Sequence, residues 1–353
     1  MIDINGSYGE GGGQVLRTSL SLAAITGQPI RINRIRAGRK KPGLAAQHLT
    51  AVRAVAAICQ AQVQGDELGS TTLEFIPGCP PQAGDYTFDV TQTKEGGSAG
   101  AVMLILQTIL LPLALATGDS VVTLKGGTHV SWSPPTTYIE HVYLPFLRQL
   151  DVQAQVQLRA WGWYPQGGGE VELQVTGNGG GVSSRLGSLH LLERGALQQV
   201  WGLAVVTNLP SHIPQRMASR AENLLQQANL KGRVQPLRER GIAPGAGIFL
   251  IAEYEHSRAG FSALGRVGLP AERVAEMAFE ELMDFHTSEK AVDPFLADQL
   301  LLPTALGSQV SQYQVAEIST HLTTNAWTIE QFGLAEVEID EDRRLVTVKP
   351  VMS

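Results

Sequence analysis

The chain has 353 residues, of which 43% are hydrophobic and 17% charged. The length is typical of about two globular domains of roughly 150 residues, and the composition excludes a disordered chain. The net charge of −6 argues against a protein that coats long nucleic acids. The two cysteines, Cys59 and Cys79, form neither a disulfide framework nor a zinc-binding spacing, so we expect a cytoplasmic protein. The most apolar run, residues 101–116, is too short to span a bilayer, and the first ten residues lack the pattern of a signal peptide, so we expect no membrane partner.

The first part of the chain predicts the order strand, helix, strand, helix, strand, strand. Apolar spacing and turn residues place these elements at residues 1–6, 15–25, 29–35, 42–60, 61–64 and 71–76. A glycine loop from Glu10 to Gln14 separates the first strand from the first helix.

The same order then recurs. The second unit has a glycine loop at 95–100 and elements at residues 86–90, 101–116, 120–124, 134–150, 152–158 and 170–175. The third has a helix, a strand, a helix and two strands, at residues 294–306, 310–315, after His321, 335–339 and 345–348. The run LQTILLPLAL at 106–115 matches ADQLLLPTAL at 297–306, proline on proline. Because each sheet must bury one face, the sequence predicts an α/β (α+β) fold in which three βαβαββ repeats pack their helices around a shared core. The alternative is ordinary α/β recurrence with accidental similarity.

Extra sequence lies between the second and third units. It begins in the glycine-rich segment 178–184 and contains predicted strands and helices at residues 200–206, 212–228, 232–236, 247–253 and 270–285. We therefore expect a small α/β domain at 184–287, inserted into a larger domain made of 1–183 plus 288–353.

Two segments carry groups that can bind or attack phosphate. Residues 31–41 contain six cationic side chains and no acid in a loop bounded by Gly and Pro, which suits either anion binding or an ordinary solvated face. In STHLTTNAWTIEQF (319–332), Thr323 or Thr324 is expected to cap a helix, with His321 just before it. A neutral imidazole there can attack phosphorus, although a lone histidine is more often a structural hydrogen-bonding group.

Several longer motifs occur in order along the whole chain: GSYGEGGGQVLRTSLSLAAITGQP, IRAGRKKPGLAAQHLTAV, KGGTHVSWSPP, WYPQGGGEVE, FLADQLLLP and HLTTNAWTIEQF. Together they resemble the RNA 3'-terminal phosphate cyclase family. The resemblance implies the three-repeat fold with its insertion, related to the enolpyruvyl transferases. It also implies an ATP-dependent enzyme of the ligase class that converts an RNA 3'-phosphate end to a 2',3'-cyclic phosphate and releases AMP and pyrophosphate. In the family the histidine of the last motif carries AMP, and here that residue is His321.

The resemblance also implies roles for other residues. The expected catalytic residues are His321, Arg17, Arg36 and Arg39, and the expected ATP-binding residues are Gln107, Pro134, Phe295, Asp298 and Gln299. The expected contacts to the RNA phosphate are Gln14, Gln47 and His48, and Glu10 is the expected ligand of a Mg²⁺ or Mn²⁺ ion. Phe295 departs from relatives with Tyr or His at this position, which keeps a ring for stacking but loses a polar group. Structural readings stay open for Gln47, His48 and the triple glycine, which also suit helix hydrogen bonds and a tight turn.

Two other functions share this architecture. One is a non-catalytic relative of the cyclases that works in ribosome assembly and is expected to lack the histidine. The other is an enolpyruvyl transferase, which forms no nucleotide adduct. The presence of His321 with Arg17, Arg39 and Asp298 favours the cyclase, with RNA 3'-phosphate ends and ATP as its partners.

Overall fold

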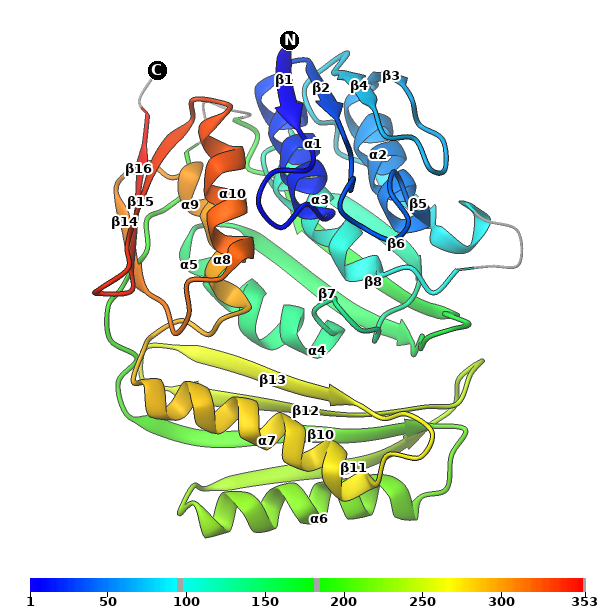
Figure 1. Cartoon of the computed structure of the whole chain (residues 1–353), viewed down its shortest axis with the longest axis vertical. Coiled ribbons are helices and arrows are strands. Elements are labelled where there is room, and N and C mark those ends of the chain that lie inside the picture. The colour runs from blue at the N-terminus through cyan, green and yellow to red at the C-terminus, as the bar shows by residue number, and fades with distance from the viewer. Residues whose placement is uncertain (94–97, 181–184, 352–353) are drawn as a thin grey trace.

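The computed structural model describes residues 1–93, 98–180 and 185–351, and it contains four four-stranded sheets (Figure 1). Part of the second glycine loop (95–97) and the end of the glycine-rich segment (181–184) lie outside the described residues. The predicted boundary of the inserted domain, at 184, therefore lies outside them as well.

The first sheet has the strand order β1-β2-β4-β3 and is built from one continuous segment. Its elements are β1 (Ile2–Asn5), α1 (Gln14–Thr26), β2 (Ile30–Asn33), α2 (Ala46–Cys59), β3 (Gln62–Gln64) and β4 (Leu73–Ile76). Alternation in β2 buries Ile30 and Ile32 while Arg31 stays exposed, which is the pattern of a sheet with one face on the core.

The second sheet repeats this topology as β5-β6-β8-β7. Its elements are β5 (Asp85–Asp89), the 3₁₀ turn η1 (Val90–Thr93), α3 (Val102–Ala114), β6 (Ser120–Gly126), α4 (Thr136–Tyr138), the π turn η2 (Ile139–Tyr143), α5 (Leu144–Gln149), β7 (Gln153–Ala160) and β8 (Gly169–Thr176). The single helix predicted at 134–150 is thus divided into α4, η2 and α5. Pro145 has no amide hydrogen to continue a regular α-helical ladder, and the π turn lies just before it.

The third sheet has the order β15-β16-β14-β9, which is the same topology read from the other end. Its elements are β9 (His190–Leu191), α8 (Leu296–Gln299), α9 (Leu301–Ala305), β14 (Ser311–Gln314), α10 (Thr320–Glu330), β15 (Ala335–Asp340) and β16 (Leu345–Pro350). The sequence showed no first strand for this unit. The structure supplies it as β9, which pairs parallel to β14 from more than a hundred residues earlier in the chain.

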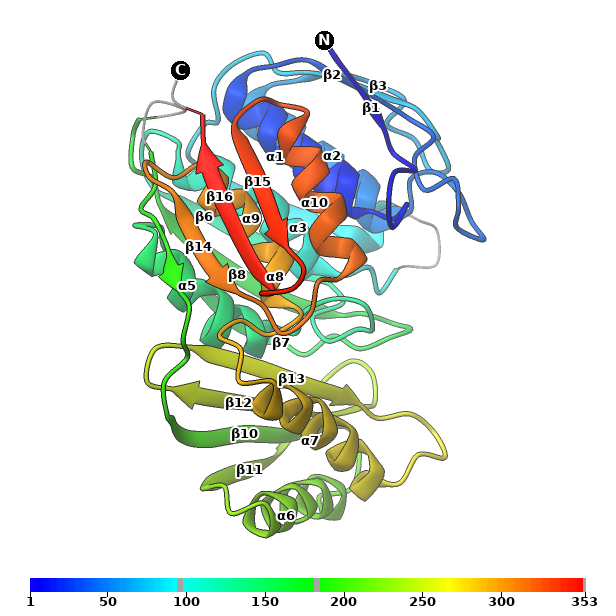
Figure 2. The same cartoon turned by 60° about the vertical axis from the view of Figure 1, so that its left-hand side comes forward.

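The fourth sheet, ordered β11-β10-β12-β13, forms the lower part of the molecule (Figures 1 and 2). Its elements are β10 (Leu197–Thr207), α6 (His212–Gln227), β11 (Gly232–Glu239), β12 (Gly245–Tyr254), β13 (Arg258–Leu264) and α7 (Ala271–Ser288). Strand β13 was not predicted. Because β9 belongs to the third sheet, the strand pairing supports a first boundary after Leu191 rather than at 184. The division into two domains stays a prediction.

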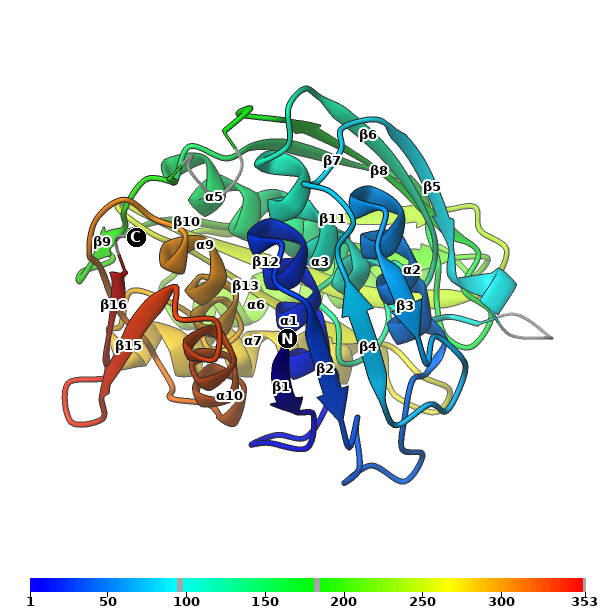
Figure 3. The same ribbon diagram turned by 90° about the horizontal axis from the view of Figure 1, so that it is seen from above.

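Helices lie between the three repeated sheets when the molecule is seen from above (Figure 3). Every residue of α3 is buried except Gln107, which is partly exposed, and buried residues of all three units form one continuous core. The predicted fold class, three βαβαββ repeats around a helical core, is confirmed. None of the described helices combines the length and the apolar composition needed to cross a bilayer.

Candidate functional site

His321 lies on the first turn of α10, and its side chain is exposed. The expected cap at Thr323 or Thr324 is wrong, because the hydroxyl of Ser319 accepts the hydrogen bond from the amide of Leu322 (3.2 Å). The helix therefore begins earlier than predicted and includes His321. The imidazole is held at the positive end of the helix dipole, where negative charge is stabilised.

The first glycine loop packs against this helix. The amide of Glu10 donates to Thr324 Oγ1 (3.0 Å), and the ring of Tyr8 stacks on Trp327 at a centroid distance of 3.9 Å. Gly9 has φ +57° and faces Thr324 so closely that a Cβ there would overlap its hydroxyl. Opposite ends of the chain therefore meet at the start of α10.

Gln14, Arg17 and Asp298 form a hydrogen-bonded chain beside His321. Gln14 Nε2 donates to Asp298 Oδ2 (3.1 Å), and Arg17 Nη2 donates to Gln14 Oε1 (3.1 Å). Burial raises the pKa of Asp298 to about 6, and the nearby charges of His321 and Arg17 oppose this rise. Burial also lowers the pKa of Arg17 to about 10, and Asp298 opposes this shift. At neutral pH the three partly buried side chains thus present one cation and one carboxylate near the exposed imidazole.

Two residues to which the sequence assigned no role hold this chain in place. Asn325 Nδ2 donates to the backbone oxygen of Asp298 (2.7 Å), and Asn325 Oδ1 accepts from Thr18 Oγ1 (2.6 Å). Asn325 and Thr18 are both buried. The HLTTNAW motif contains Asn325, but its partners lie far away in sequence, so the motif alone cannot reveal them.

His48 is a buried residue close to Arg17. Its pKa lies well below the usual value because of burial and the charges of Arg17 and Arg36, so the ring is neutral. His48 Nδ1 accepts from the amide of Ala45 (3.2 Å), which leaves Nε2 as the protonated nitrogen. The Nε2 atom lies against the backbone of Gly13. His48 is therefore a hydrogen-bond donor beside the glycine loop and a poor base.

Two arginines of the basic loop also contact or influence residues of this site. Arg36 donates to the backbone oxygen of Gly43 (2.6 Å), which closes the loop and leaves its charge close enough to affect His48. Arg39 forms an ion pair with Glu10 in the glycine loop. The structure thus brings both arginines to the cluster, although residues 36–41 precede α10 by almost the whole length of the chain.

The expected adenosine residues form a second group. Gln107 Nε2 donates to Gln299 Oε1 (2.7 Å), and Gln299 Nε2 donates to the backbone oxygen of Phe295 (2.6 Å). Phe295 is 48% exposed, which is unusual for a large apolar residue and leaves it accessible for stacking. Helix α8 carries both Asp298 and Gln299 and so joins this group to the Gln14–Arg17–Asp298 chain.

Pro134 and Gln47 are less directly connected. Pro134 is partly buried just before α4, whose Tyr138 ring meets Phe295 edge-on at 6.5 Å. Gln47 Oε1 accepts from the amide of Ala101 at the start of α3 (2.9 Å), so this side chain already has a structural partner in the free protein.

The residues present do not make a metal-binding cage. Within residues 1–93, 98–180 and 185–351, no three His, Cys, Asp or Glu side chains gather as a metal group. The carboxylate of Glu10 is already paired with Arg39. Since Mg²⁺ prefers several oxygen ligands in octahedral geometry, Glu10 offers at most one of them.

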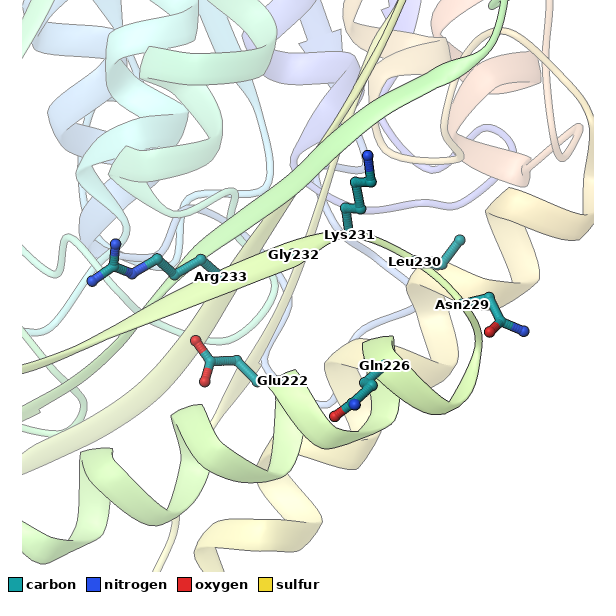
Figure 4. Close-up of a pocket in the computed structure, with 7 residues that line it drawn as sticks. All are labelled: Glu222, Gln226, Asn229, Leu230, Lys231, Gly232 and Arg233. Atoms are coloured by element: carbon teal, nitrogen blue, oxygen red, sulfur yellow. The ribbon is translucent and has the colours of Figure 1, made fainter.

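A shallow hollow beside the fourth sheet is a separate feature (Figure 4). It is lined by α6, by the loop that follows and by the start of β11, through Glu222, Gln226, Asn229, Leu230, Lys231, Gly232 and Arg233. None of the residues singled out from the sequence lines it, so it does not belong to the candidate site.

Comparison with known proteins agrees with the motifs. The family model described as RNA 3'-terminal phosphate cyclase matches residues 8–339. A protein of that name from Nostoc punctiforme is 68% identical over 353 residues, which cover 100% of both chains. Those from Gloeothece citriformis and Trichormus variabilis are 66% and 64% identical, each covering 99% of both chains. The solved enolpyruvyl transferase NikO from Streptomyces tendae covers 98% of this chain and 81% of its own at 11% identity, but its TM-score of 0.26 is too low to bear on fold or function.

A match over nearly the entire chain, with relatives at such identity across their full length, shows that this chain belongs to the RNA 3'-terminal phosphate cyclase family.

Proposed function

We propose that the protein uses ATP to convert an RNA 3'-phosphate to a 2',3'-cyclic phosphate, with His321 as the residue that carries AMP. One observation supports this most directly. The exposed imidazole of His321 stands at the positive end of α10, within electrostatic reach of Asp298, and Gln14 links Asp298 to Arg17 by hydrogen bonds.

The first step is nucleotidyl transfer to the protein. An imidazole nitrogen of His321 attacks the α-phosphorus of ATP, an N–P bond forms, and the bond to the β-phosphate breaks to release pyrophosphate. Arg17, Arg36 and Arg39 supply positive charge for the triphosphate as negative charge builds on the leaving group. Arg39 first has to exchange its ion pair with Glu10 for one with phosphate.

Two further steps close the ring. An oxygen of the RNA 3'-phosphate attacks the phosphorus of the adduct, which frees His321 and leaves an RNA-(3')pp(5')A end. The neighbouring 2'-hydroxyl then attacks the 3'-phosphorus and expels AMP. Because hydroxyl and phosphorus belong to the same sugar, proximity lowers this barrier. Gln14 and the Nε2 donor of His48 bind the RNA phosphate in this scheme, and Gln47 joins them when the RNA end displaces its bond to Ala101.

The base and ribose of ATP occupy the second group of residues. Adenine stacks between Pro134 and the exposed Phe295 ring, and Asp298 accepts from the ribose, while Gln107 and Gln299 face the nucleotide. If Mg²⁺ or Mn²⁺ is bound by the triphosphate, Glu10 would supply at most one protein ligand, and the ion would offset the negative charge of the phosphates. We also propose a cytoplasmic location, because Cys59 and Cys79 are both free thiols.

The test is to incubate the protein with ATP labelled at the α-phosphate and to measure label that stays on the chain. We expect an acid-labile, alkali-stable adduct that maps to His321 and is absent from His321→Ala. The matched control is His256→Ala, which removes an exposed histidine in the turn after β12 and should leave labelling unchanged. Normal labelling of His321→Ala would assign the nucleophile elsewhere. Absence of label from the wild type would favour a binding protein or an enolpyruvyl transferase.

A further inference from the structure

Asp293 is fully buried at a point where three segments of the chain meet, and none of the steps above uses it. Its Oδ1 accepts from the hydroxyl of Tyr138 (2.9 Å) and from the amides of Phe295 and Leu296 (2.9 Å each). Its Oδ2 lies 3.0 Å from the same hydroxyl and accepts from the amide of Gly260 (3.3 Å). One carboxylate therefore joins α4, the start of α8 and strand β13 of the inserted sheet.

The four donors are neutral, so this carboxylate is not one half of an ion pair. Burial raises the pKa of Asp293 to about 6, and the hydrogen bonds oppose this rise. A buried acceptor with several donors fixes the relative positions of the groups that supply them, because moving any one leaves a polar atom unsatisfied in a place that water does not reach.

Tyr138 connects the three segments by packing as well as by its hydroxyl. The ring is 4% exposed and meets the ring of Phe295 edge-on at 88°. Gly260 also lies against this ring, since a Cβ there would be 2.5 Å from Tyr138 Cδ2. The absence of a side chain at Gly260 is what lets β13 approach α4 this closely.

These contacts bear on Pro134 and Phe295, which lie just outside the junction. Pro134 immediately precedes the cap residue of α4, and the Phe295 amide is itself bound by Asp293. We propose that Asp293 is a positioning residue that sets the spacing between Pro134 and Phe295, and that the inserted domain takes part in nucleotide binding by holding this junction through Gly260. The inference rests on the proposed function in that Pro134 and Phe295 are taken as walls of the ATP pocket.

The first test is Asp293→Asn in the full chain, because the amide keeps the shape but places an N–H₂ group against donors. We expect ATP binding to weaken by about tenfold, with a matching rise in KM for ATP. The rate of adduct formation at saturating ATP should stay within about twofold of the wild type, since no group that touches the reacting atoms changes. The control is Asp284→Asn, which alters an exposed carboxylate on α7.

The second test perturbs the same junction by a substitution in the predicted inserted domain, on β13. Gly260→Ala should displace the Tyr138 ring and weaken ATP binding in the same way, although residue 260 touches no nucleotide. Gly241→Ala is the matched control, because its nearest neighbour would be the Thr207 side chain at 3.2 Å. Tyr138→Phe keeps the ring and removes one donor, so we expect a smaller loss of about threefold.

ATP binding is measured by equilibrium dialysis, and thermal unfolding shows whether each variant is folded. If Asp293→Asn does not fold, Gly260→Ala and Tyr138→Phe test the inference in its place. Unchanged ATP affinity in the folded variants overturns the inference. So does a fall in rate at saturating ATP with affinity unchanged, because that would assign Asp293 to the chemical step. A wild type that binds ATP but forms no adduct would reject the proposed function while leaving the role of Asp293 open to these same measurements.

Discussion

Gly13 shows how closely single residues are fitted together in the candidate site. A Cβ at this position would overlap both His48 Nε2 and Arg17 Nη1, closer than real Cβ atoms approach other atoms. Because Gly13 has no side chain, His48 and Arg17, which are both candidates for phosphate binding, can lie against the backbone just before α1. The triple glycine suggested a tight turn from sequence, but its contact with His48, on another helix, appears only in the structure.

We expect Gly13→Ala to slow adduct formation by at least about tenfold, because His48 and Arg17 must move away from the glycine loop. Gly38→Ala is the matched control in the basic loop, since a Cβ there would have open space. The measurement is the rate of labelling by ATP at saturating concentration. Equal rates for the two variants would show that the glycine loop adapts without disturbing the chemistry.

His129 is a buried residue whose effect should be on stability rather than on activity. It packs against the rings of Trp161, Trp163 and Phe249, and its Nδ1 lies 2.8 Å from Thr128 Oγ1. Burial lowers the pKa of His129 to about 3. In the unfolded chain the His129 imidazole becomes protonated near pH 6.5, whereas in the folded chain it stays neutral until about pH 3. Protonation of His129 therefore favours the unfolded chain as the pH falls.

The free energy of unfolding should therefore decrease between pH 6.5 and pH 3, with His129 contributing up to about 5 kcal/mol of that decrease. Above pH 6.5 its contribution is constant. We expect His129→Gln to show a shallower loss over this range, measured by denaturant titration at a series of pH values. The same slope in both proteins would mean that other groups account for the acid sensitivity.

At the scale of elements, α10 was predicted from its apolar spacing, but its first residue was not. Both Ser319 and the threonines that follow are good capping residues, so composition does not choose between them. The choice is made by the loop after β14 and by Thr324, whose hydroxyl accepts from the Glu10 amide instead of capping its own helix. A side chain with a tertiary partner is not free to cap.

Ser319→Ala should reduce stability by about 1 kcal/mol and also slow adduct formation, because the lost cap loosens the turn that carries His321. The control is Thr323→Ala, an exposed residue whose hydroxyl bonds within the helix to Thr320, and it should change neither quantity appreciably. Denaturant titration and labelling by ATP measure the two effects. If Thr323→Ala were the more damaging change, the cap would be assigned wrongly.

At the scale of the whole molecule, three sheets of the same topology surround the helices, and the third sheet is completed across the insertion by β9 (Figure 3). The chain leaves the third unit after one strand and returns for the other three. In this arrangement the fourth sheet lies beside α4 and the start of α8, where its strand β13 reaches Asp293. Helix α3 packs against α1 and α2 of the first unit and against β6 and β8 of its own, and Gln107 on this helix bonds Gln299 of the third unit.

Leu110→Ala should remove about 2 to 5 kcal/mol from the free energy of unfolding, because loss of a fully buried leucine side chain in α3 leaves a cavity in the shared core. Leu68→Ala, at a leucine that is 46% exposed, should cost less than about 0.5 kcal/mol. Denaturant titration of both variants gives the comparison. A small loss at residue 110 would indicate that the three units are not one cooperative core.

The amino-acid sequence by itself determined the order of the helices and strands, the repeat and the family motifs, because apolar periodicity and Gly/Pro punctuation are local signals. The sequence did not predict β9 or β13, and a strand of two residues such as β9 is too short to show an apolar periodicity. It also predicted single helices at 134–150 and 294–306, where the structure has several shorter ones. The tertiary structure alone decided which side chains meet. Gln14 bonds Asp298 across 284 residues and Glu10 bonds Thr324 across 314. Buried polar groups take the partners that packing brings within reach, and packing depends on the whole chain at once.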